Sequence, residues 1–291
     1  MFGEVRLLLL PSRFPTLLFA AGSVSPNARW MNTMMNKREF LKVIGGSGLA
    51  FSVFPLLVAQ QQPASEHPLV PAIRYARMCL EKVEALPGYE ATFYKQEVVD
   101  NATVKHRMKI KVRHNPFSVY LYFENPYEGR EVIFVEGQNN GKLLAHEGGL
   151  LSVVGTMELA PSDPTAMTEN RYPITRAGIA KLVQGVIDQW ESEIRYDESE
   201  VKYYKDAKLG STTCRVIECT HPVPRKQFNF HRTRLWINDA DGLPIRVQQF
   251  GFPPNAGAPA PIVEDYTFTD IKTDVRLTDA DFDRNNSRYN F

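Results

Sequence analysis

Eleven short stretches of β-forming residues, most of which alternate apolar and polar side chains, fill most of the sequence after residue 88. A period of two is typical of strands with one buried face, and Gly-, Pro- or Asn-containing turns separate these stretches. The predicted strands are 89–98, 104–113, 117–123, 132–135, 142–146, 150–154, 200–204, 213–220, 227–237, 244–252 and 262–271. The chain must therefore build a large sheet.

Two stretches follow a helical period instead. Ile73, Ala76, Leu80 and Val83 form one apolar stripe, which predicts a helix over 71–86 that Pro87-Gly88 stops. A broader stripe predicts a second helix after a Thr175 N-cap, and its apolar face is expected to pack in the core. The stripe consists of Ile179, Leu182, Val183, Val186, Ile187, Trp190 and Ile194.

The expected fold class is α+β and mainly antiparallel β: an open, strongly curved, barrel-like sheet wrapped around about two helices. No internal repeat and no linker divides residues 71–291, so a single β-rich domain is expected there, after a linker over 61–70. With 43% hydrophobic and 23% charged residues, the chain is not of the disordered class.

An export signal is expected over residues 31–60. Basic residues over 37–42 precede an uncharged run, 43–59, which ends in Leu57-Val58-Ala59, a tolerable cleavage site. The basic pair resembles a twin-arginine signal in which Lys37 replaces the first arginine, and ordinary Sec export stays open. The alternative is an uncleaved anchor, although the run is short and glycine-rich for a spanning helix. The protein is therefore expected in the periplasm or cell envelope, membrane-anchored if the signal is retained.

Residues 1–30 hold a second apolar stretch that is broken by Pro11 and Pro15. Met31, Met34 and Met35 all stand just before the basic pair. We expect translation to begin at one of them, which would make residues 1–30 a non-native or disordered extension.

Charge and motifs exclude several classes of function. The net charge is +1, and residues 61–291 hold 28 basic and 31 acidic residues, which argues against nucleic-acid binding. After residue 60 there is no P-loop, no G-x-G-x-x-G, no G-x-S-x-G and no H-E-x-x-H. The sequence therefore predicts no enzyme, no catalytic residue and no cofactor.

The cysteines could serve as metal ligands or form a disulfide. Cys219 and His221 share one face of a strand, but Cys214 points to the other, so this trio does not converge and no metal site is predicted. The same spacing keeps Cys214 and Cys219 too far apart for a disulfide. A pairing of Cys79 with either stays open, beside three buried thiols.

Four blocks of the sequence resemble the bacterial domain of unknown function 1571 (DUF1571) over roughly residues 72–291. They are Phe117–Pro126, Asn170–Thr175, Arg234–Asn238 with Gly242–Pro244, and Tyr266–Asp270 with Leu277–Phe282. The C-terminal blocks are also similar to LolA/LolB-type lipoprotein carriers, in which a strand ending in Trp, a Gly-Leu-Pro turn and a closing Asp-Phe recur. The second resemblance implies an open β-barrel over helices, with an apolar cavity for acyl chains.

The function expected from this resemblance is a non-catalytic, monomeric carrier that binds a lipid or a lipidated peptide. The candidate apolar lining is Met108, Ile110, Val119, Leu121, Phe123, Trp236 and Phe250. Arg113 and Arg171 are candidates for a polar rim that meets an anionic head group. The alternative is an envelope interaction or scaffold module with a filled core and an exposed patch, for instance the Tyr94/Tyr120/Tyr122 face, that meets a protein partner.

Overall fold

The computed structural model describes residues 66–291. The predicted extension over 1–30, the predicted export signal over 31–60 and positions 61–65 of the predicted linker lie outside the described residues. The α-helices are α1 (Leu69–Glu84), α2 (Pro164–Met167) and α3 (Ile179–Glu193). Short 3₁₀ helices are η1 (Asn139–Gly141), η2 (Gly149–Val154), η3 (Ile174–Arg176) and η4 (Asp279–Phe282).

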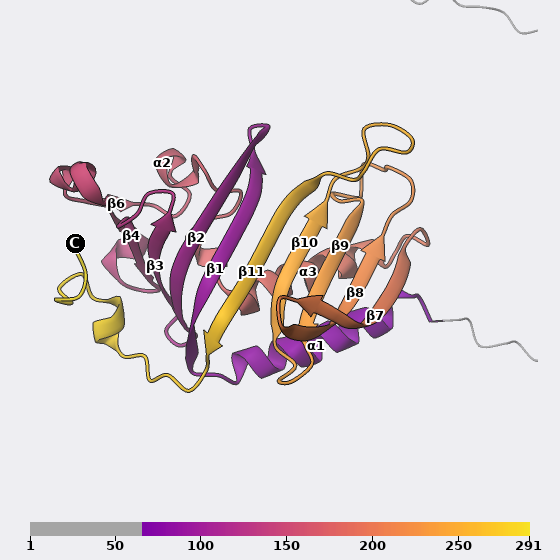
Figure 1. Ribbon diagram of the computed structural model, residues 1–291, viewed down its shortest axis with the longest axis horizontal. Coiled ribbons are helices and arrows are strands. Elements are labelled where there is room, and N and C mark those ends of the chain that lie inside the picture. The colour runs from indigo at the N-terminus through magenta and orange to yellow at the C-terminus, as the bar shows by residue number, and fades with distance from the viewer. Residues whose placement is uncertain (1–65) are drawn as a thin grey trace, which may run out of the picture. The chain divides into compact units, whose positions relative to one another are not determined.

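The strands form one eleven-stranded sheet in the order β6-β5-β4-β3-β2-β1-β11-β10-β9-β8-β7, and every neighbouring pair is antiparallel. Their bounds are β1 Gly88–Val99, β2 Ala102–Arg113, β3 Ser118–Asn125, β4 Glu131–Val135, β5 Leu143–His146, β6 Thr156–Leu159, β7 Glu200–Leu209, β8 Thr212–Thr220, β9 Arg232–Asn238, β10 Pro244–Phe250 and β11 Ile262–Lys272. Strand β11 lies between β1 and β10 and joins two meanders (Figure 1). The predicted curved antiparallel sheet with few helices is confirmed.

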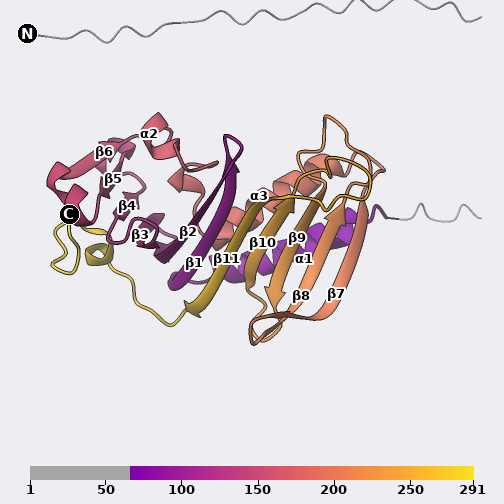
Figure 2. The same ribbon diagram turned by 45° about the horizontal axis from the view of Figure 1, so that its top comes forward.

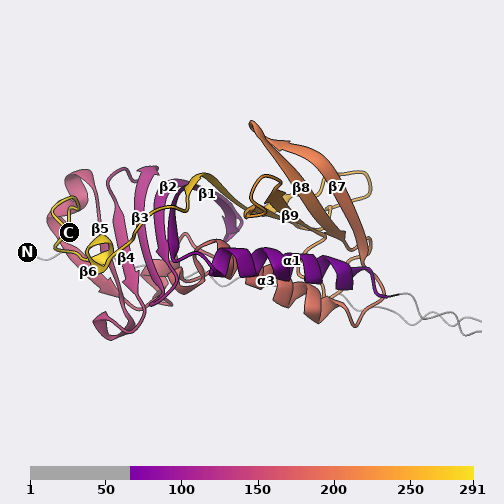
Figure 3. The same ribbon diagram turned by 90° about the horizontal axis from the view of Figure 1, so that it is seen from below.

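Helices α1 and α3 lie side by side on one face of the sheet, which we call its inner face (Figures 1 and 3). Each helix buries the stripe that its sequence predicts. In α1, Ala72, Ala76 and Val83 are 0% exposed, and in α3 so are Val183 and Trp190. Full burial of one such apolar side chain stabilises the fold by about 1.5–3 kcal/mol. None of the helices within residues 66–291 has the length and apolarity that crossing a membrane requires.

The helices follow the β7–β11 part of the sheet, whereas β1–β6 curve round toward α2 (Figure 2). Each face of the sheet carries a hydrophobic core. The large one lies between the inner face and the helices. A small one on the outer face holds Tyr120, Ile133, Val135 and Phe282 under the C-terminal tail.

The C-terminal tail covers part of the tyrosine face, Tyr94/Tyr120/Tyr122, that the sequence predicts to be exposed. Tyr120 is only 5% exposed, because the ring of Tyr289 stacks on it with centroids 4.2 Å apart. Asn290 also donates two hydrogen bonds to Glu131. Tyr94 remains 39% exposed. The tail thus covers much of the outer face that the interaction alternative would need.

One predicted strand is wrong. Residues 150–154 form the 3₁₀ helix η2, and the neighbouring residues Thr156–Leu159 form β6 instead. The run Leu-Leu-Ser-Val-Val has no alternation, and glycines with positive φ, Gly149 at 61° and Gly155 at 77°, turn the chain at both ends of it. Leu150 and Val153 are consequently 94% and 88% exposed.

The predicted N-cap of the second helix is also wrong. Thr175 lies in η3, and Gly178 precedes α3 with a φ of 95°. The first free N–H of the helix, on Ile179, donates to the buried hydroxyl of Tyr89 at 2.7 Å. A Cβ on residue 178 would meet that hydroxyl at 3.0 Å. Strand β1 therefore supplies the cap that the local sequence lacks.

We expect the substitution Tyr89→Phe to lower the free energy of unfolding by about 1–3 kcal/mol, because it leaves the buried N–H of Ile179 without an acceptor. Urea unfolding followed by circular dichroism measures the change. Tyr203→Phe is the matched control, since Tyr203 is 48% exposed, and it should cost less than about 0.5 kcal/mol. Equal losses in the two variants would contradict this role of Tyr89.

Candidate functional site

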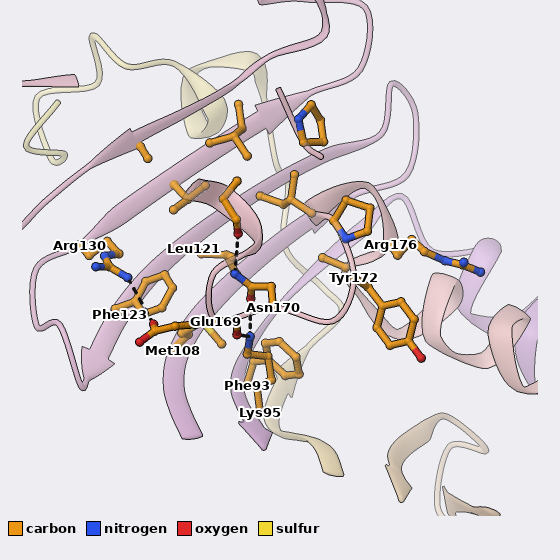
Figure 4. A pocket seen from close by; sticks show the side chains of 18 of the residues that line it. Phe93, Lys95, Met108, Leu121, Phe123, Arg130, Glu169, Asn170, Tyr172 and Arg176 are labelled. Atoms are coloured by element: carbon orange, nitrogen blue, oxygen red, sulfur yellow. Dashed lines mark hydrogen bonds and ion pairs between the residues drawn. The ribbon is translucent and has the colours of Figure 1, made fainter. Parts of the chain in front are cut away.

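A cavity of about 430 Å³ lies within the curved part of the sheet. One wall of the cavity is the inner face of β1 to β6 and β11. The other wall is formed by residues 161–178, which we call the cover segment, and by Leu182 of α3 (Figure 4). The helix α3 begins at the end of the cover segment. The cavity therefore occupies the part of the inner face that the long helices leave uncovered.

The strand wall is apolar, because side chains two residues apart share one face of a strand. Its apolar members are Phe93, Met108, Leu121, Phe123, Val132, Leu143, Ala145, Met157, Leu159 and Phe268. Pro161, Ala166, Pro173, Ile174 and Ala177 add apolar surface from the cover segment. The strand wall combines residues from Phe93 to Leu159 with Phe268, and the curvature of the sheet brings these distant parts of the chain around one space.

A polar cluster fastens the cover segment to β1. Lys95 as a residue is 7% exposed. Its ammonium group donates to the backbone oxygen of Glu169 at 2.9 Å and to the side-chain oxygen of Asn170 (Figure 4). It also lies 3.3 Å from Glu97 Oε2. The Asn170 side chain donates in turn to the backbone oxygen of Ala166 at 2.8 Å. One buried cation thus holds the cover segment through two of its oxygen atoms, while Glu97 on the same strand provides the balancing negative charge.

A second set of contacts reaches Glu169 from β2 and from the turn between β3 and β4. The Tyr127 hydroxyl donates to Glu169 Oε1 at 2.5 Å, His106 Nε2 lies 3.2 Å from Oε2, and Arg130 lies 3.9 Å from the same oxygen. Arg130 also pairs with Glu147 at 2.9 Å. The carboxylates that line the cavity are therefore engaged by protein donors.

The middle of the cover segment is also tied to β1 and β11. The backbone N–H of Arg171 donates to Glu97 Oε2 at 2.9 Å, and its guanidinium pairs with Glu264 at 2.7 Å. Tyr172 donates to the same Glu264 oxygen at 2.8 Å, and Tyr266 donates to Glu97 Oε1 at 2.6 Å. Both buried glutamates, Glu97 at 3% and Glu264 at 1% exposure, have charged and hydroxyl partners.

The pKa values in this cluster are shifted by burial and by its charges. Burial and the charge of Lys95 lower the pKa of His106 to about 4, against the opposing pull of Glu169, so this imidazole is neutral near pH 7. Burial lowers the pKa of Lys95, and Glu97 and Glu169 oppose that change. Burial raises the pKa of Glu169, but the hydrogen bonds from Tyr127 and His106 and the charge of Arg130 outweigh it and hold the value below the usual range.

Three of the predicted lining residues, Met108, Leu121 and Phe123, line the cavity. Ile110 and Val119 share their face but lie further along β2 and β3, at 1% and 0% exposure in the main core. There the start of α3 covers the sheet, so these two positions pack as ordinary core.

Trp236 and Phe250 do not line the cavity. They belong to the outer face of β9 and β10, opposite the buried Leu235 and Ile237. Trp236 donates to Gln248 at 3.0 Å, and the Phe250 ring lies under Arg232 with 4.6 Å from the guanidinium carbon to the centroid. The side chains of β9 and β10 alternate between two faces as the sequence predicts. The sequence does not say which of the two faces the helices cover.

The two predicted rim arginines lie apart from each other. Arg113 stands at the other end of β2, where it pairs with Asp279 at 2.7 Å and packs over Phe282 of the tail. Arg171 is bound to Glu264, while its neighbours Asn170 and Tyr172 line the cavity. Neither guanidinium is among the groups that line the cavity.

Sequence reasoning missed the polar residues of the site. Lys95 and Glu97 continue the apolar face of Tyr89, Ala91 and Phe93 by the period of two, so the buried face of β1 turns from apolar to charged. That change on one strand face was a signal in the sequence. Glu169 and Asn170 left no such signal, because a loop has no period.

Solved structures with a similar fold have low sequence identity. A LolA superfamily protein from Nitrosomonas europaea is 13% identical, with 72% of this chain and 97% of that chain covered and a TM-score of 0.30. The Mycobacterium tuberculosis lipoprotein LppX is 15% identical, with 72% and 100% covered and a TM-score of 0.41. A chain of the Pseudomonas aeruginosa MucA/MucB complex is 14% identical, with 73% and 60% covered and a TM-score of 0.40.

Similarity at this level concerns the arrangement of sheet and helices only. No curated protein matches the chain. The model of the family "Protein of unknown function (DUF1571)" matches residues 86–291, which include all the blocks that carry the predicted resemblance. The chain belongs to the DUF1571 family.

Proposed function

We propose that this chain is an exported cell-envelope protein that binds a lipid or a lipidated ligand in its cavity without catalysing a reaction. The observation that carries the proposal is the apolar cavity of about 430 Å³ between the curved sheet and the cover segment. Its volume falls in the range of about 300–1,000 Å³ that small-molecule sites occupy. Export follows from the predicted signal over residues 31–60.

The physical basis of binding is the transfer of methylene groups out of water. Each buried CH₂ group contributes about 0.8 kcal/mol, so a chain of several methylenes needs no catalytic or charged group to bind. The apolar strand wall supplies the surface for such a chain. The polar cluster of Lys95, Glu169 and Arg130 lies at the same cavity, and its groups are paired within the protein.

A second candidate function, an envelope interaction module, is favoured by η2. Leu150, Leu151, Val153 and Val154 are 94%, 58%, 88% and 63% exposed on this one short element. Exposed apolar groups that lie together mark contact surfaces more often than scattered ones do. This candidate requires a protein partner that covers η2 and does not require a ligand in the cavity.

Native mass spectrometry of the full-length protein, purified without detergent, is the first test. We expect a bound species of lipid mass that organic extraction removes. The substitution Ala166→Phe, which adds a ring to the cover segment inside the cavity, should weaken uptake of a fluorescent fatty acid by about tenfold or more. Ala256→Phe adds the same ring to an exposed loop and should bind like the unchanged protein.

Thermal unfolding of both variants shows whether the fold is intact. A protein that carries no lipid and takes up no fatty acid would overturn the carrier proposal and leave the interaction module as the better hypothesis. Equal uptake by the two phenylalanine variants would place the bound chain outside this cavity.

The affinity for saturated fatty acids should depend on chain length. We expect the dissociation constant to fall by up to about fourfold per added CH₂ until the cavity is full, and then to stay constant. In Ala166→Phe the plateau should begin at a shorter chain. Competition titrations with a series of fatty acids measure both. An affinity that does not change with chain length would mean that the head group alone is bound.

A further inference from the structure

Three side chains with metal-binding atoms meet in the core, apart from the cavity. Glu193 ends α3, and Cys219 and His221 stand at the end of β8 and just beyond it. One ligand atom from each, a carboxylate oxygen, a sulfur and an imidazole nitrogen, lies within 4.8 Å of the other two. All three residues are 1% exposed.

Three polar atoms of this group, Glu193 Oε2 and both ring nitrogens of His221, lack hydrogen-bond partners among the described residues. His221 Nε2 lies 3.1 Å from Glu193 Oε2, but the two are not aligned as a hydrogen bond, and neither has another partner among the described residues. His221 Nδ1 has none there either. Buried polar atoms are nearly always satisfied in native proteins. Two unsatisfied lone-pair-bearing atoms that face the same point, beside a thiol, therefore indicate a missing positive group.

Neighbouring residues fix the orientation of these side chains. Gln189, one turn earlier in α3, donates to Glu193 Oε1 at 3.0 Å and lies 3.2 Å from the Thr233 hydroxyl of β9. The Phe228 ring stacks on the His221 imidazole at 3.7 Å with an angle of 5° between the planes. The free Glu193 oxygen and the imidazole edge are held toward each other, as outer partners hold the ligands of metal sites.

We propose that Glu193, Cys219 and His221 bind one divalent transition-metal ion of the zinc class. Zinc accepts this mixture of sulfur, nitrogen and oxygen, and a set of three protein ligands leaves one position for water. A thiolate and a carboxylate together neutralise the two charges of the ion, so the buried Glu193 gains the cation that it lacks. The bound ion would join the end of α3 to the end of β8.

The geometry requires a small adjustment. Ligand atoms of a tetrahedral zinc site lie about 3.5 Å apart, given bond lengths of about 2.0–2.3 Å. Atoms that now lie within 4.8 Å of one another must move by about 1 Å, which side-chain torsions provide. The sequence alone predicts no metal site, because Cys214 faces away from Cys219 and His221; in the proposed site the third ligand is Glu193 of α3, 26 residues before Cys219.

Cobalt(II) substitution is the first test, because a cobalt–thiolate bond has a charge-transfer absorption in the near ultraviolet. The full-length protein, freed of metal by a chelator, is titrated with Co²⁺ and then with Zn²⁺. We expect the band to saturate at one ion per chain, to disappear in Cys219→Ser and to persist in the matched controls Cys214→Ser and Cys79→Ser, whose thiols are also buried.

The strength of binding gives a second, independent readout. Zinc at about 100 times its dissociation constant should raise Tm by about 5–10 °C, and Glu193→Gln should abolish that rise. Gln189→Ala should weaken zinc binding by about 10–100-fold, as the loss of an outer partner does. Circular dichroism of each metal-free variant shows whether it folds.

The proposal is overturned if the unchanged protein takes up no zinc, or if Cys219→Ser binds cobalt with the same spectrum. Zinc binding that survives both Cys219→Ser and Glu193→Gln would identify a surface site instead. None of these residues lines the cavity, so either result leaves the proposed lipid binding untouched.

Discussion

The pairing of β11 with both β1 and β10 is the constraint on which the rest of the molecule depends. Strand β11 is the last strand of the chain, yet it lies beside the first one and forms antiparallel ladders on both sides, for example Phe93 with Phe268 and Val247 with Tyr266. Without it, β1–β6 and β7–β10 would be two separate meanders. The contacts between β1 and β11 span about 170 residues, so their loop-closure cost must be met by burial over the whole inner face.

The joined sheet is wider than two helices can cover. The apolar stripes of α1 and α3 are satisfied against the β7–β11 part and the adjoining core. The inner face of β1–β6 is equally apolar, but it faces only a short helix and a loop, which cannot fill the concave space. The cavity thus forms because the sheet is strongly curved and the cover segment is too slender to pack against all of it.

Buried charges hold these loosely packed elements in place. The cover segment has little regular structure, so its backbone hydrogen bonds cannot fix it, and Lys95, Glu97 and Glu264 provide acceptors and donors from the sheet instead. Such groups are costly to bury unless every one of them is paired. Around Lys95 every charged group meets this condition, and only the neutral His106 keeps a ring nitrogen, Nδ1, without a partner among the described residues. The group of Glu193, Cys219 and His221 does not, and this difference between two buried polar clusters separates a structural network from a candidate metal site.

The sequence by itself determined the local elements, because periods of two and of 3.6 follow from how side chains leave a strand or a helix. It therefore located ten of the eleven strands and both long helices, and three residues of the cavity wall, Met108, Leu121 and Phe123. It failed at 150–154, where glycines rather than alternation decide the backbone, and at Trp236 and Phe250, where the choice of buried face depends on the position of the helices. Which residues meet across the sheet, such as Lys95 with Asn170 or Glu193 with His221, was decided only by the tertiary structure. Those contacts join distant parts of the chain, and they depend on strand order and curvature, which no local pattern records.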